Sequence, residues 1–281
     1  MTFARRVAWC AVATYAGLTL ISIVAFYSMI GQPVPSGADP SVWAAGYQFG
    51  MRWFGLLIVL AGFIAAIAGL ADAVGWRRSV LGTVAIVAIT ATIECIGAKT
   101  GVPFGAHGYG TQLGPLFLGL IPYSIPLSWF LMLYASLGIA LRARVGHVLT
   151  LLLAAVGLFA WDLLMEPAMS AAFPFWFWRD SGVWYGMPLA NWLAWLVIGP
   201  AIGAVLWRVA GVDLRRTGTD RLPQVIYAIT GLMPLGMAFR FGQTMALLVG
   251  GSAMILYALG PEVWLRLSAR RLGPVQGVAP P

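Results

Sequence analysis

The chain has 281 residues, of which 60% are hydrophobic and only 9% are charged. Soluble domains usually carry about 25% charged residues, so this composition excludes an ordinary soluble protein and indicates an integral membrane protein. The net charge of +8 does not indicate a nucleic-acid partner, because the arginines stand in small groups between apolar runs, as in the loops of membrane proteins.

Successive apolar stretches of about 20 residues predict about eight membrane-spanning helices. The alternation of apolar and polar residues that a barrel requires is not visible, so the spans are expected to be helical. The expected fold is an all-α polytopic transmembrane helix bundle over residues 1–271, followed by a flexible tail rich in Pro and Gly over residues 272–281. The predicted spans are residues 9–30, 50–72, 80–98, 122–141, 147–166, 190–208, 222–239 and 243–260.

Positively charged residues gather on one side of this arrangement. If the N-terminus is inside, only Arg52, Lys99, Arg179 and Arg240 of the 17 Lys and Arg residues fall on the outer side. Lys and Arg are enriched in cytoplasmic loops. The sequence therefore predicts that both termini are cytoplasmic and that the protein is a multi-pass protein of the cell (inner) membrane.

Two segments on the outer side are too apolar or too aromatic for ordinary loops. Residues 99–121 combine Gly and Pro with apolar side chains, and residues 167–189 are rich in Phe, Trp and Tyr. We expect both segments to lie in the membrane interface or to re-enter the membrane against the bundle. An interfacial belt accounts for the aromatic residues, and an additional role in lining a substrate site stays open.

Three carboxyl groups lie within or at the edge of predicted spans: Glu94, Asp162 and Glu166. Placing a carboxyl group within the membrane costs free energy, so a carboxyl group found there is first considered as a functional residue. At 1.5 Å per residue, Glu94 and Asp162 lie about 21 and 22 Å along their helices, and therefore at a similar depth. Asp162 and Glu166 are four residues apart and share a helix face. Three such groups cannot all ionise cheaply, so at least one is expected to be a neutral acid.

A purely structural role for these carboxyl groups stays open, because each could pair with Lys99, Arg179, Arg52 or an amide and fasten helices together. No ligand spacing supports a metal site that includes His107. His147 is expected near the opposite membrane surface, so a haem held by two histidines is not expected either. We therefore predict no metal and no other cofactor.

Two blocks of sequence form a specific pattern. The first is Glu94-x-x-Gly97-x-x-x-Gly101-x-Pro103-Phe104-Gly105-x-His107-x-Tyr109, followed by Leu113-Gly114-Pro115. The second is Asp162-x-x-x-Glu166-Pro167, then Trp176-x-Trp178, then Trp184-Tyr185-Gly186-x-Pro188-x-x-Asn191-Trp192-x-x-Trp195. Together they resemble the CruF-type carotenoid 1,2-hydratase family over about residues 90–200. The chain departs from the expected pattern at position 107, where Tyr is expected, and at position 166, where Asp is expected.

This resemblance implies addition of water across the terminal C1=C2 double bond of an acyclic carotenoid end group, without a cofactor. The partners implied are membrane lipid, the carotenoid substrate and other carotenoid-pathway enzymes. Glu94 and Asp162 are the expected acid/base pair, in undecided order, with Glu166 as a third catalytic residue that helps to orient them. The expected substrate-binding residues are Phe104, His107, Tyr109, Trp178, Trp184, Tyr185, Asn191 and Trp195.

Two other functions stay open from the residues alone. Another isoprenoid-lipid enzyme, such as a cyclase or a transferase, would use the same acid chemistry. In a proton-coupled membrane transporter the carboxyl groups would relay protons. Many transporters contain internal repeats, and no convincing repeat is present here, which disfavours the transporter.

Overall fold

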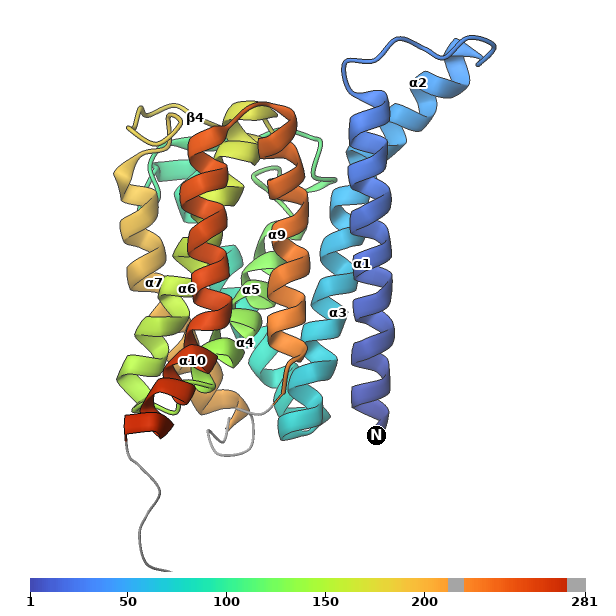
Figure 1. The fold of residues 1–281 in the computed structure, drawn as a ribbon. Helices are drawn as coiled ribbons and strands as arrows, with labels where there is room; N and C mark the ends of the chain where they lie inside the picture. Colours follow the sequence, from blue (N-terminus) through green and yellow to red (C-terminus); the bar gives the residue numbers. More distant parts are fainter. Residues whose placement is uncertain (212–219, 272–281) are drawn as a thin grey trace, which may run out of the picture.

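In the computed structural model, which describes residues 1–211 and 220–271, eight helical segments are long and apolar enough to cross a membrane. They correspond one to one with the eight predicted spans, so the predicted all-α bundle is confirmed (Figure 1). The predicted tail at 272–281 lies outside the described residues. The segments are α1 (Phe3–Met29), α2–η1–α3 (Pro40–Phe49, Gly50–Phe54, Gly55–Val74), α4 (Trp76–Thr100), α5 (Ser124–Leu141), α6–η2 (His147–Glu166, Pro167–Ala172), α7 (Leu189–Ala210), α9 (Leu222–Arg240) and η3–α10 (Ala246–Gly251, Ser252–Arg271).

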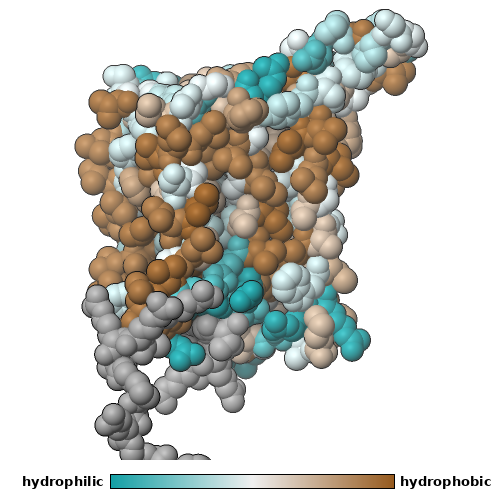
Figure 2. All heavy atoms as spheres, viewed as in Figure 1, coloured by the Kyte–Doolittle hydropathy of each residue, from teal (hydrophilic) through white to brown (hydrophobic). Residues whose placement is uncertain are grey.

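The surface carries a broad apolar belt between two more polar ends (Figure 2). Large apolar side chains on the outer faces of the helices are exposed, among them Val24, Val84, Val197 and Leu256. A contiguous apolar surface of this kind would promote aggregation in water, whereas lipid tails solvate it. The belt therefore supports a membrane location for the bundle.

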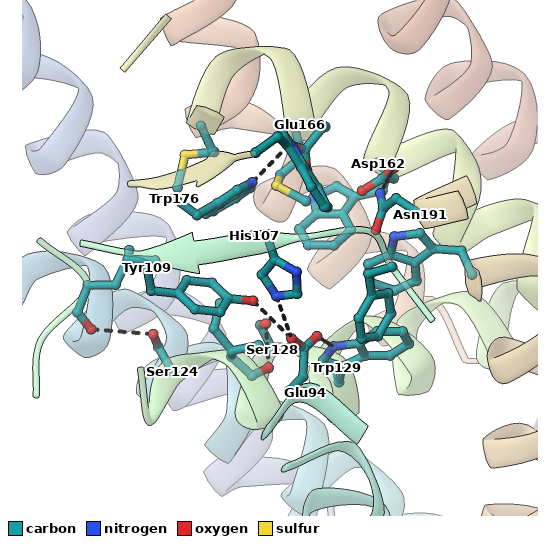
Figure 3. A pocket seen from close by; sticks show the side chains of 18 of the residues that line it. Glu94, His107, Tyr109, Ser124, Ser128, Trp129, Asp162, Glu166, Trp176 and Asn191 are labelled. Atoms are coloured by element: carbon teal, nitrogen blue, oxygen red, sulfur yellow. Dashed lines mark hydrogen bonds and ion pairs between the residues drawn. The ribbon is translucent and has the colours of Figure 1, made fainter. Parts of the chain in front are cut away.

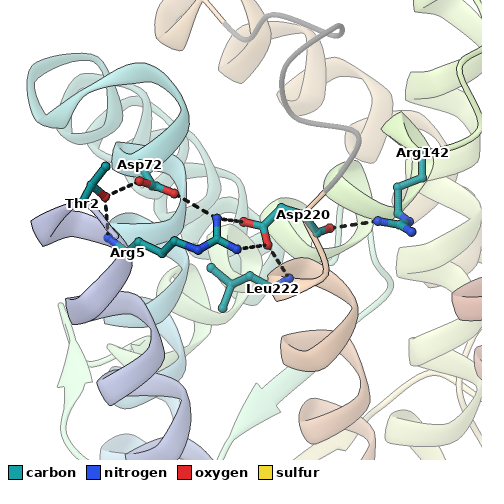
Figure 4. Close-up of polar contacts among 6 residues, drawn as sticks. All are labelled: Thr2, Arg5, Asp72, Arg142, Asp220 and Leu222. Carbon is teal, nitrogen blue, oxygen red and sulfur yellow. Dashed lines mark hydrogen bonds and ion pairs between the residues drawn. The ribbon is translucent and has the colours of Figure 1, made fainter.

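The start of α1 and the end of α10 lie at the same end of the bundle (Figure 1). A polar network joins the helices there (Figure 4). Arg5 contacts the carboxylates of Asp72 at 3.3 Å and Asp220 at 3.2 Å, and Arg142 donates to the backbone carbonyl of Asp220 at 3.2 Å. The network ties α1 to the end of α3, the approach to α9 and the end of α5. That this end faces the cytoplasm remains a prediction.

At the opposite end, the two unusual outer segments pair with each other. Strand β1 (His107–Tyr109) runs antiparallel to β4 (Trp176–Trp178), with His107 opposite Trp178 and Tyr109 opposite Trp176. A second short pair joins β2 (Leu116–Phe117) to β3 (Ile121–Pro122). These strands form a cap over the end of the bundle (Figure 1).

The core lies around α5, where every residue from Trp129 to Leu141 is buried. Its contacts with α3, α4, α6 and α9 make it the central helix, whereas α1 packs mainly on α3 and α9 at the edge of the bundle. Pro167 ends the α-helical part of α6, but the span continues as the π-helix η2. Single π-helical turns inside spans often occur at functional sites.

Candidate active site

A buried cavity of about 140 Å³ lies between α4, α5, α6 and α7, beneath the β1–β4 cap (Figure 3). It is lined by all three carboxyl residues that the sequence singled out, and Glu94, Asp162 and Glu166 are only 5%, 0% and 2% exposed. Glu94 comes from α4, whereas Asp162 and Glu166 come from one face of α6. The carboxyl groups were expected at a similar depth from the rise of their helices, and in the structure they line the same cavity.

Glu94 accepts hydrogen bonds on both of its carboxyl oxygens. Oε1 accepts from the indole Nε1 of Trp129 at 2.7 Å, and Oε2 accepts from the hydroxyl of Tyr109 at 2.9 Å. Gly97, one turn further along α4, permits this arrangement, because a Cβ there would lie 2.7 Å from the ring of Phe104 and 3.3 Å from that of His107. The glycine therefore allows the residues that follow α4 to fold back over Glu94.

His107 also faces Glu94, with its Nε2 3.9 Å from Oε2 (Figure 3). Its other nitrogen, Nδ1, lies 2.9 Å from the carbonyl oxygen of Gly105. Since a carbonyl can only accept, Nδ1 carries a hydrogen, and in a neutral ring Nε2 is then an acceptor. Burial raises the pKa of Tyr109 well above its ordinary range, and the Glu94 carboxylate adds to this effect, so the phenol remains a donor.

Asp162 differs from Glu94 because one of its oxygens is free. Oδ2 accepts from the amide of Asn191 at 3.1 Å, whereas Oδ1 is fully buried and makes no hydrogen bond of good geometry among the described residues, with the indoles of Trp192 and Trp195 as its neighbours. Unsatisfied buried polar atoms are uncommon in folded proteins and often mark a catalytic role or a bound molecule. The free oxygen of Asp162 is thus available to a substrate or to water.

Glu166 receives two indole donors on a single oxygen. Trp176 and Trp178 donate their Nε1 hydrogens to Oε1, at 2.8 and 2.5 Å. Alternate residues of a strand point to the same face, so the Trp-x-Trp spacing of β4 places both indoles toward the same carboxyl. Because an indole N–H can only donate, this contact holds Glu166 as an acceptor.

Aromatic faces form the wall on the side of α5 and α7. The rings of Trp129 and Trp195 stack with centroids 3.9 Å apart and planes at 17°, and Trp161 meets Trp195 edge to face at 6.1 Å. Aromatic faces stabilise a nearby cation but have no lone pair that would capture it. The cavity thus combines proton-carrying groups with walls that suit a carbocation.

Most of the predicted substrate-binding residues line this cavity, and two do not. Trp184 donates to the carbonyl of Leu163 at 3.2 Å, and the Tyr185 hydroxyl accepts from the amide of Ala246 at 3.3 Å, so both brace the cap against the helices. Sequence reasoning did not single out Trp129 or Trp161, and it used Trp176 only as part of a motif. The predicted residues in the lining are Phe104, His107, Tyr109, Trp178, Asn191 and Trp195.

Of the structural pairings considered for these carboxyl groups, an amide partner is present, because Asn191 on α7 donates to Asp162 on α6, whereas the lysine and arginine partners are not seen in the described part of the chain. Lys99, Arg179 and Arg52 form no ion pair with any of them, and their polar partners are indoles, a phenol, an amide and the His107 ring. Among the described residues, no group of three His, Cys, Asp or Glu side chains is arranged to hold a metal ion.

Comparisons with known proteins identify the family of this chain. Residues 53–257 match a family described as "carotenoid biosynthesis protein". The chain is also 32% identical over 172 residues to the bisanhydrobacterioruberin hydratase of Haloarcula japonica, a match that covers 60% of this chain and 55% of that relative. The chain thus spans about half the length of that relative. No solved structure matches the chain.

The match to the family model runs from the start of α3 into the first turns of α10 and includes every residue that lines the cavity. The resemblance found in the two sequence blocks is thereby confirmed at the level of the family. This chain belongs to the carotenoid biosynthesis protein family.

Proposed function

We propose that the protein is a carotenoid 1,2-hydratase that adds water across the terminal C1=C2 double bond of an acyclic carotenoid end group. The observation that supports this most directly is the gathering of three buried carboxyl groups in one tryptophan-walled cavity, with one oxygen of Asp162 free. The hydratase activity named for the similar haloarchaeal protein is the same class of reaction.

In this mechanism Asp162 is the acid. Its free oxygen carries the proton and delivers it to C2 of the end group, where the C1=C2 π electrons form the new C–H bond. The positive charge then lies on C1, a tertiary carbon, next to the faces of Trp129 and Trp195. Asn191 holds the other oxygen of Asp162 and fixes the direction of the free one. Protonation by a positioned acid is typically worth about 10²–10⁴-fold in rate.

Glu94 is the base in the second step. A water oxygen bonds to C1, and the water proton passes to Glu94, which completes the tertiary alcohol. His107 Nε2, an acceptor beside Glu94, can take that proton onward. A proton must then return to Asp162, so that the net reaction consumes one water and no other reagent. The indole and phenol donors leave oxygens of Glu94 and Glu166 as hydrogen-bond acceptors, which suits a base and an orienting group respectively.

The direct experiment is expression in a lycopene-producing host, followed by mass analysis of the pigments. A hydratase adds the mass of one or two waters to lycopene. An isoprenoid cyclase would give products of unchanged mass with altered retention, and a transporter would leave the pigment unchanged. Unaltered lycopene in membranes that contain the folded protein would overturn the proposal for this substrate class.

A further inference from the structure

A second cavity of about 150 Å³ adjoins the first, and we call it the tail cavity. It extends between α1, α3 and α9, and therefore leads from the carboxyl groups toward the helix at the edge of the bundle. The residues that line both cavities are Val59, Leu113, Ser128, Trp161, Met165 and Met169. A ligand longer than the first cavity would reach the second across these shared residues, without passing the cap.

The tail cavity contains no carboxyl group, and all of its hydroxyl groups except that of Ser22 have protein partners within the part of the chain that the structure describes. Tyr15 donates to the Thr230 hydroxyl at 2.8 Å, Thr19 donates to the Tyr15 carbonyl at 2.8 Å, and Ser128 donates to the Ile125 carbonyl at 2.8 Å. The remaining lining is mostly Met, Ile, Leu and Phe. Apolar cavities of about 150 Å³ remain dry and accept apolar guests. The chemistry therefore suits a hydrocarbon rather than water.

We propose that the tail cavity binds the part of the substrate polyene that follows the reacting end group, and directs it toward α1 at the edge of the bundle. This inference rests on the proposed function, because it takes the end group to react in the first cavity. A rod-like hydrocarbon chain attached to that end group is the ligand that the two adjoining and largely apolar spaces fit.

Gly55 on α3 lies at the junction of the two cavities. It lines the tail cavity, and a Cβ built on it would lie 3.3 Å from Cδ2 of Leu113, which lines both. Its backbone is α-helical, with φ −58° and ψ −44°, so a larger residue fits the backbone without strain. Gly55→Leu is therefore expected to close the junction, and replacing Leu113 by Ala in the same chain should reopen it.

The test uses full-length protein purified from lycopene-producing cells, with the total bound lycopene, hydrated or not, measured per mole of protein. Wild type should carry pigment, and Gly55→Leu should carry at least about ten-fold less at a similar monodisperse yield. The double variant Gly55→Leu/Leu113→Ala should recover most of the binding. Gly17→Leu is the matched control, since it lies in a spanning helix and a Cβ there meets no atom within 4 Å.

If lycopene binding recovers in the double variant, the loss in Gly55→Leu comes from closure of the junction and not from misfolding. Three results would overturn the proposal that the tail cavity binds the polyene. These are an unchanged amount of bound carotenoid in Gly55→Leu, an equal loss of bound carotenoid in Gly17→Leu, and wild-type protein that carries no carotenoid. Failure of the proposed function looks different: wild type would bind lycopene in a Gly55-dependent way and yet add no water to it.

Discussion

Nε2 of His107 lies 3.9 Å from Oε2 of Glu94, and both residues line the cavity. The carbonyl of Gly105 fixes the opposite nitrogen at 2.9 Å, so the ring cannot easily present a different atom. A buried carboxylate that takes a proton from water must pass it on before the next turnover. The acceptor nitrogen of His107 is placed for that transfer.

We expect His107→Gln to lower the rate of hydration about 10- to 100-fold, with little loss of folded protein. The amide of Gln can still donate to Gly105, but it cannot take up and release a proton at useful rates. The rate should be measured in isolated membranes and expressed per mole of folded protein. An unchanged rate would show that proton transfer does not use this ring.

Asp162→Asn should remove hydration by at least about 10²-fold while the protein still inserts and folds. The new side chain keeps an oxygen for the amide of Asn191, which accounts for the expected folding, but it has no acidic proton. Hydrated carotenoid and folded protein should be quantified on the same membranes. The matched control is Asp72→Asn, at the opposite end of the bundle, which should leave the product level unchanged.

The predicted orientation can be tested independently of chemistry. Reporter fusions after Arg78 and Arg144 should report the cytoplasm, and fusions near Ser36 and Ser181 should report the outside. The reason is the excess of arginine at the end that holds the network of Arg5 and Arg142. A cytoplasmic report at Ser181 would contradict the orientation and would put the cap on the other side of the membrane.

The number and order of the spans were predictable, but the ends of the helices were not. An apolar window marks the part of a helix that lies in lipid, whereas polar caps set where the helix begins. Thr2 accepts from the backbone of Arg5 at 3.1 Å, so α1 begins six residues before the predicted start at residue 9. Asp39 accepts from the backbone of Ser41 at 2.7 Å and starts α2 well before residue 50.

The grouping of the carboxyl groups was predictable because helix rise alone gives their depth. Their hydrogen-bond donors were not, because Trp129 stands in an apolar span, where an inward and a lipid-facing tryptophan look the same in sequence. Tyr185 is the opposite case, because the sequence predicted it to bind the substrate and it does not line the cavity. It lies in a motif beside the cavity residues, but its backbone φ of 52° turns the chain there, and its side chain reaches η3 instead.

A catalytic role and a structural role of Glu94 can be distinguished by two substitutions, which are expected to differ in their effect on the yield of folded protein. In Glu94→Gln the amide oxygen can accept from Trp129, and the amide nitrogen can donate to Tyr109, whose hydroxyl also accepts. Trp129 keeps its acceptor and Tyr109 keeps one hydrogen bond to the new side chain, so we expect a folded yield close to normal, with product lowered at least about 10²-fold.

Glu94→Leu should instead lower the folded yield as well as the product. It leaves the Trp129 indole and the Tyr109 hydroxyl buried without their acceptor, at a cost of about 1–3 kcal/mol for each group. Both variants should be compared by size-exclusion profile, by thermal midpoint and by hydrated product per folded protein. Near-normal product in Glu94→Gln would falsify its role as the base. In that case the hydrogen bonds to Trp129 and Tyr109 would have a structural purpose, and Glu166 would be the remaining carboxylate to test.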